Sequence, residues 1–62
     1  MRIKELRGLK NLTQEDLAQE LNVERSTVAM WEADQAMPRA DKLPELARIL
    51  ECTIDELYEK EV

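Results

Sequence analysis

The chain has 62 residues, with 14 acidic and nine basic side chains, no histidine, one cysteine and a formal net charge of −5. A chain this short folds as one small domain and buries only about 60% of the surface that its unfolded form exposes. A single cysteine excludes an internal disulfide, and without histidine the lone Cys52 is a poor start for a zinc site, so no metal and no other cofactor is expected.

The N-terminal sequence Met-Arg-Ile-Lys-Glu lacks the apolar core of a signal peptide. No run approaches the roughly 18 apolar residues that a membrane span needs. We therefore expect a cytoplasmic protein with no membrane partner.

Scarce Gly and Pro, and abundant Leu, Glu, Ala, Lys and Arg, predict an all-α domain over residues 1–62. Ile3, Leu6 and Leu9 recur at a spacing of three and predict the apolar stripe of a first helix. Asn11 suits the left-handed position that ends such a helix.

A second helix is expected after Thr13, whose hydroxyl can cap it while Asp16, three residues later, completes a capping box. Asn22 tolerates the positive φ that a tight turn between two helices needs. A third helix follows over about 24–32.

The second and third helices carry matching apolar faces. Val28 and Trp31, three residues apart, point back at Leu17 and Leu21, so we expect Trp31 in the core and not stacked on a base. Ala18 is small enough to let the two helices cross closely. Residues 14–33 therefore predict a helix-turn-helix, which places its second helix in the DNA major groove.

A loop is expected over 34–38, and a fourth helix after Asp41 as its N-cap, which puts Pro44 in the first turn, where a missing N–H costs little. Thr53 is expected to cap a fifth helix, and residues 59–62 are expected to fray. The positions expected to be buried in these two helices are Leu43, Leu46, Ala47, Leu50, Ile54 and Leu57.

From residue 2 to residue 58 the sequence resembles the phage repressor and Cro type of helix-turn-helix protein, also called the xenobiotic-response-element type. The segments that carry the resemblance are Leu-Thr-Gln-Glu-Asp-Leu-Ala (12–18), Val-Ala-Met-Trp-Glu (28–32), Pro38, Leu-Pro-Glu-Leu-Ala (43–47) and Thr-Ile-Asp-Glu-Leu (53–57). The resemblance implies a compact five-helix domain whose third helix contacts bases, and a homodimer on a two-fold operator.

The sequence departs from this family at four positions that usually hold glycine, which here are Asn11, Asn22, Asp34 and Glu51. Asn tolerates positive φ, whereas Glu51 costs on the order of 1 kcal/mol if its backbone is left-handed. The basic residues that often follow the recognition helix are replaced by Asp-Gln-Ala-Met (34–37), which predicts weaker phosphate binding on that side.

The resemblance implies roles for individual residues on the solvent side of the third helix, opposite Val28 and Trp31. Arg25 can donate two hydrogen bonds to guanine, although a solvated charge is the alternative. The candidate base-contacting residues are Arg25, Ser26, Met30 and, at the margin, Ala29.

Three further groups complete the predicted site. Gln14 is expected to contact a phosphate, and Thr27 either packs in the protein or contacts a phosphate. The cations that flank the motif either contact the DNA backbone or are solvated surface charges. The full phosphate-contacting set is Gln14, Thr27, Lys10, Arg39 and Lys42. Arg7 and Glu32 are expected to form an ion pair that orients the recognition helix. The predicted dimer seam is Leu50, Cys52, Ile54 and Tyr58, with Cys52 filling core as the main alternative for that residue.

We therefore expect a small transcriptional regulator, most simply a repressor, that binds a double-stranded DNA operator with an inverted repeat and lies beside the nucleoid. Its DNA binding is expected to be controlled by the concentration of the protein itself, through the equilibrium between monomer and dimer, and not by a small-molecule ligand. The alternative is a protein-interaction module on the same fold, antitoxin-like or an acidic DNA mimic, because −4 of the net charge lies in residues 43–62. An enzyme is not expected, since the sequence offers no histidine, no Gly-rich phosphate loop and no nucleophile beside a base.

Overall fold

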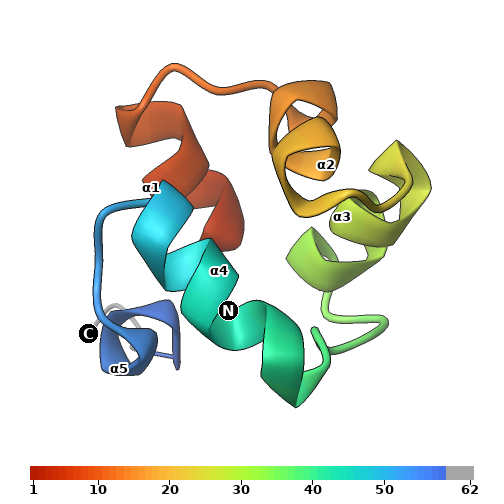
Figure 1. Cartoon of the computed structure of the whole chain (residues 1–62). Coiled ribbons are helices and arrows are strands. Elements are labelled where there is room, and N and C mark those ends of the chain that lie inside the picture. The colour runs from red at the N-terminus through yellow and green to blue at the C-terminus, as the bar shows by residue number, and fades with distance from the viewer. Residues whose placement is uncertain (59–62) are drawn as a thin grey trace.

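Short helices make up most of residues 1–58, the part of the chain that the structure, a computed structural model, describes (Figure 1). In chain order they are α1 (Ile3–Leu9), α2 (Gln14–Leu21), α3 (Arg25–Glu32), the 3-10 turn η1 (Ala40–Lys42), α4 (Leu43–Ile49) and α5 (Ile54–Tyr58). The predicted all-α fold with five α-helices is confirmed. No helix in the described part of the chain is long and apolar enough to span a bilayer. The expectation of fraying at 59–62 lies outside the described residues.

Two helices begin with the same reciprocal capping device. At α2, Thr13 Oγ1 accepts the Asp16 N–H at 3.0 Å, and the Asp16 carboxylate accepts the Thr13 N–H at 3.0 Å. At α5, Thr53 and Glu56 make the equivalent pair of bonds at 3.1 and 2.8 Å. Both caps were predicted from the sequence, and each satisfies two N–H groups that a helix start leaves unpaired.

Four of the connections turn through a left-handed residue that is not glycine. The φ angles are 57° at Asn11, 59° at Asn22, 59° at Asp34 and 54° at Glu51. These are the four positions where the family usually has glycine, so the chain keeps the turn geometry with residues that tolerate it less well. Asn22 ends α2 and creates the bend into α3.

The helices enclose one apolar core. Val28 and Leu17 are fully buried and Trp31 is only 4% exposed, as predicted from their spacing. Every α-helix contributes to this core, whose members are Ile3, Leu6, Leu17, Ala18, Leu21, Val28, Trp31, Leu46, Ala47, Leu50 and Leu57.

Two residues predicted to be buried are on the surface. Leu9 is 73% exposed, because each three-residue step falls about 60° short of a full turn and so carries it about 120° away from Ile3. Ile54 is 39% exposed, because the five-residue helix α5 packs through Leu57.

The start of α4 also differs from the prediction. Asp41 lies inside η1 and does not cap α4; the extended residue is Arg39, with φ −66° and ψ 156°. Pro44 has no N–H to pair with the Ala40 carbonyl, which accepts from Leu43 instead, so the chain forms a 3-10 turn first. Pro44 itself lies in the first turn of α4, as expected.

Candidate nucleic-acid interface

Helix α3 buries one face and presents the other to solvent. Val28 and Trp31 lie against α2 and the core, whereas Arg25, Ser26 and Met30 are exposed. Within residues 1–58 the Ser26 side chain makes one hydrogen bond, from its hydroxyl to Glu24 at 3.4 Å. Among the described residues, Arg25 has no hydrogen bond or ion pair, so its guanidinium keeps all of its donors free for a ligand.

An open groove runs beside this face, where the α1–α2 connection meets the first turns of α2 and α3. It is lined by Arg7, Asn11, Leu12, Thr13, Gln14, Glu15 and Arg25. The groove joins the predicted phosphate-contacting residue Gln14 and the predicted base-contacting residue Arg25, which are far apart in sequence. It also exposes the start of α2, whose first N–H groups have no intrahelical partners.

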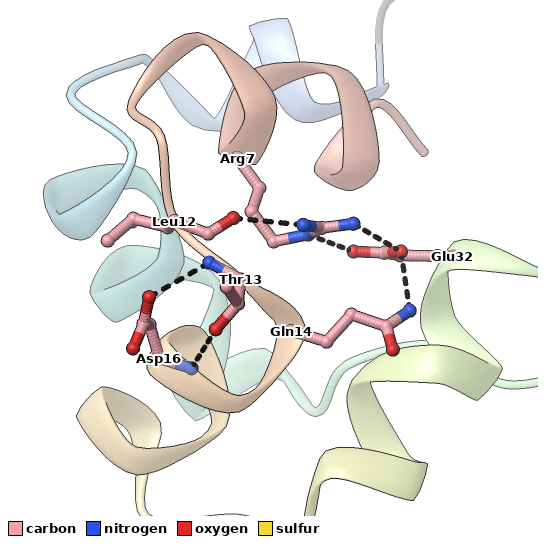
Figure 2. A network of polar contacts seen from close by, with 6 residues as sticks. All are labelled: Arg7, Leu12, Thr13, Gln14, Asp16 and Glu32. Carbon is pink, nitrogen blue, oxygen red and sulfur yellow. Dashed lines mark hydrogen bonds and ion pairs between the residues drawn. The ribbon is translucent and has the colours of Figure 1, made fainter.

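A polar network behind this groove connects α1, α2 and α3 (Figure 2). Arg7 Nε donates to Glu32 Oε2 at 2.8 Å and Arg7 Nη2 donates to Glu32 Oε1 at 3.2 Å, a bidentate pair. Arg7 Nη1 donates to the Leu12 carbonyl at 2.9 Å, and Gln14 Nε2 donates to Glu32 Oε1 at 2.9 Å. With side chains 15% and 5% exposed, Arg7 and Glu32 are largely shielded from water.

The electrostatics of Glu32 follow from this network. Burial by itself raises the pKa of Glu32, but hydrogen bonds from Arg7 and Gln14, together with the positive charges of Arg7 and Lys4, outweigh it and leave the pKa below its ordinary value of 4.5. Glu32 is therefore ionised at neutral pH and binds α3 to α1 through a charge-assisted contact.

The predicted base-contacting residues come together on one surface. Arg25, Ser26 and Met30 are all exposed on α3, and Ala29 is half-buried at the edge of the same face. Thr27 is also half-buried, between this face and the packed side of the helix.

The predicted phosphate-contacting cations are more dispersed, and each has an acidic neighbour. Lys10 forms an ion pair with Glu51, and Arg39 lies 3.8 Å from Asp41 while remaining 88% exposed. Lys42 is engaged differently: its ammonium donates to the main-chain carbonyl of Leu21 at 3.1 Å. None of these three lines the groove that Gln14 and Arg25 share.

The predicted dimer seam divides into buried and exposed members. Leu50 is 2% exposed and belongs to the core of its own chain, so its assignment to the seam is wrong. Cys52 is half-buried and packs against the core, and burial, followed by the charge of Glu56, raises the pKa of its thiol, although Arg2 acts in the opposite direction. Ile54 and Tyr58 remain available, at 39% and 45% exposed.

Sequence reasoning missed two contacts of this region. Gln14 donates to Glu32 from 18 residues away, and Lys42 donates to Leu21 from 21 residues away. The Gln14 position was identified, but the sequence held no signal for its partner. For Lys42, the available signal was the absence of any basic residue in the last turn of α2, which leaves that helix end without its own cation.

Comparison with known proteins agrees with this geometry. The family model described as helix-turn-helix matches residues 3–57. The chain is 38% identical over 60 residues to the HTH-type transcriptional activator BcrR of Enterococcus faecalis, covering 97% of this chain and 29% of that protein. It is 35% identical over 54 residues to the uncharacterized HTH-type transcriptional regulator YobD of Bacillus subtilis, covering 87% of this chain and 48% of that protein. The chain thus spans less than half the length of these two relatives.

A third relative matches over more of its own length. The chain is 33% identical over 57 residues to an uncharacterized HTH-type transcriptional regulator of Archaeoglobus fulgidus, covering 92% of this chain and 80% of that protein. No solved structure gives a significant match. The chain belongs to the Cro/C1-type helix-turn-helix family of DNA-binding transcriptional regulators.

Proposed function

We propose that this domain binds double-stranded DNA sequence-specifically by placing α3 in the major groove, and that two copies occupy an operator with an inverted repeat. The observation that carries the proposal is the exposed face of α3, where Arg25 has no partner among the described residues and Ser26 and Met30 stand beside it. The opposite face is fixed by the buried side chains of Val28 and Trp31. A helix held on one side and free on the other is the arrangement that major-groove recognition requires.

The side chains of this face offer complementary chemistry to base edges. The guanidinium of Arg25 matches the O6 and N7 acceptors of guanine with two parallel hydrogen bonds. The Ser26 hydroxyl can donate or accept. Met30 and Ala29 offer apolar contact, which suits a thymine methyl group.

Phosphate contacts are proposed around this face. The N–H groups of Gln14 and Glu15, which precede the capped Asp16 N–H at the start of α2, favour an anion. The Gln14 Nε2 donates one of its two hydrogens to Glu32, and its second N–H can donate to a phosphate oxygen. Thr27, Lys10 and Arg39 are the other proposed contacts. With a net charge of −5 and few free cations, the salt dependence of binding should be shallow.

We propose a dimer because one recognition helix contacts only a short stretch of DNA. One recognition helix covers only a few base pairs, so two helices about 34 Å apart on one face of the DNA give useful specificity. Ile54 and Tyr58 on α5, with Cys52 beside them, are the proposed seam, since they are the predicted seam residues that retain exposed surface.

We propose repression as the form of regulation, because operator occupancy alone is enough to block transcription. The E. faecalis relative is named as an activator, and the matched region is 29% of its length. Activation requires a contact with the transcription machinery in addition to DNA binding, and a transcription assay on the selected operator distinguishes the two.

The test is selection of bound duplexes from a random pool, followed by affinity measurements on the enriched sequence. We expect an inverted repeat, and Arg25→Ala should weaken binding by about 1–3 kcal/mol. Arg48→Ala is the matched control, because it removes the same charge from an exposed position on α4. Equal losses for both variants, or no enrichment at all, would contradict base recognition by α3; tight binding to a protein without any to DNA would support the interaction-module alternative.

A further inference from the structure

Lys42 makes an unusual contact for a surface lysine. Its Nζ donates to the Leu21 carbonyl at 3.1 Å and lies 3.7 Å from Glu45 Oε2. The side chain is only 25% exposed, so the contact is partly shielded from water. Leu21 is the last residue of α2, immediately before the left-handed Asn22 that forms the bend into α3.

The end of α2 needs this donor. The last four carbonyls of a helix have no intrahelical N–H partners. Here the N–H groups of Asn22 and Val23 donate to the carbonyls of Gln19 and Ala18. The Leu21 carbonyl receives neither of these two backbone hydrogen bonds. The last turn of α2 also contains no basic residue that could interact with the negative end of its dipole. Lys42 supplies both the hydrogen bond and the positive charge from a distant part of the chain.

The contact crosses between two units of the fold. Lys42 ends η1 and directly precedes α4, whose Leu46 and Ala47 are buried in the core. Because Lys42 is attached to this packed helix, its hydrogen bond restrains the C-terminal end of α2 and the bend at Asn22 that follows it. Since α3 begins at Arg25, three residues beyond that bend, the same contact constrains where Arg25 is presented.

We propose that Lys42 is a positioning residue for DNA recognition: its ammonium locks the end of α2, fixes the α2–α3 bend and so sets the orientation of Arg25, without itself contacting a phosphate. This replaces the phosphate role that the sequence predicted for Lys42. The proposal rests on the proposed DNA binding, and the experiment separates the failure of one from the failure of the other.

The first measurement needs no DNA. Amide hydrogen exchange of Asn22 and Val23 is compared in the wild-type chain, Lys42→Met and Lys42→Arg, with Arg48→Met as a control that removes the same charge from an exposed position on α4. We expect exchange to be about five- to tenfold faster in Lys42→Met only, because a single hydrogen bond that restrains the bend is lost. Lys42→Arg should restore slow exchange, because it keeps a long cationic donor. Unchanged exchange in Lys42→Met would overturn the proposal.

The second measurement uses the selected operator and a duplex altered at the base pair that Arg25 contacts, over a series of KCl concentrations at which every variant is folded. We expect Lys42→Met to lose affinity for the operator and to lose discrimination between the two duplexes, with the slope of log K against log salt unchanged. A phosphate contact would instead lower affinity for both duplexes equally and make the slope shallower by about 0.9 for each phosphate lost. That result would overturn the proposal, as would wild-type affinity and discrimination in Lys42→Met. If the wild-type chain binds no duplex, the proposed function fails, while the exchange measurement still decides whether the lock exists.

Discussion

Removing the carboxylate of Glu32 is the most informative perturbation of this domain. Glu32→Leu would leave the guanidinium of Arg7, only 15% exposed, without its bidentate partner, and the amide of Gln14 without its acceptor. Removing one member of a buried pair costs about 3–5 kcal/mol. Arg7 keeps the Leu12 carbonyl and some access to water, so we expect a smaller loss than for a fully buried pair, about 2–3 kcal/mol. A domain of this size has about 3–5 kcal/mol in total, so the variant should be close to unfolding.

The assay is urea unfolding followed by the fluorescence of Trp31, the single tryptophan, which is 4% exposed in the folded chain. Glu20→Leu, a matched removal of an exposed acid on α2, should unfold within about 0.5 kcal/mol of wild type. The double variant Arg7→Met with Glu32→Leu replaces both charges with apolar groups and should recover to within about 1 kcal/mol of wild type. Wild-type stability in Glu32→Leu alone would refute the account of the network as a shielded pair.

The double variant also tests whether the pair orients α3. Its fold is expected to persist, but the guanidinium that holds the end of α3 to α1 is gone, so affinity for the selected operator should fall several-fold. If the double variant binds the operator as tightly as wild type, the orienting role of the pair is wrong.

The same carboxylate gives the domain a dependence on pH. Because the pKa of Glu32 is lowered in the folded chain, its contribution to stability is fully present above 4.5 and is lost as the pH falls through the lowered value. Bonds from the Thr13 backbone and side chain lower the pKa of Asp16, which adds a loss of the same sign. In urea unfolding measured from neutral pH to below pH 4.5, the free energy of unfolding should fall as the pH falls, and it should fall less steeply in Glu32→Gln. The same dependence of stability on pH in both chains would contradict the assignment to Glu32.

Substitutions at three positions test the local geometry by the same unfolding assay. Glu51→Gly should raise the free energy of unfolding by up to about 1 kcal/mol, because it relieves a left-handed φ of 54°, whereas Glu51→Ala keeps that strain and should not stabilise. Asn22→Ala should cost about 1–2 kcal/mol at φ 59° and Asn22→Gly less than that, so equal losses would contradict a conformational cause. Thr13→Ala should cost about 1 kcal/mol by removing the cap on the Asp16 N–H, and Thr13→Ser should retain the cap; a loss in Thr13→Ser as large as that in Thr13→Ala would argue against it.

Much of the fold could be predicted from the sequence because its signals are local. The caps at Thr13 and Thr53 involve residues three apart, and the left-handed turn at Asn22 depends on one residue type. The spacing of Val28 and Trp31 assigns a buried and an exposed side to α3, which is how the exposed surface around Arg25 could be predicted. Such features depend on backbone geometry within one or two helical turns, and the sequence lists those neighbours directly.

The tertiary structure alone decided which of several candidate residues has which partner. Leu9 and Leu50 have the same chemistry and a similar pattern, yet one is exposed and the other lies in the core, because burial depends on which helix packs against each face. Glu32 receives bonds from residues 25 and 18 positions away, and Lys42 lies on a carbonyl 21 positions away. Contacts of this kind exist only after the helices pack, since packing brings together donors and acceptors that the order of residues leaves far apart.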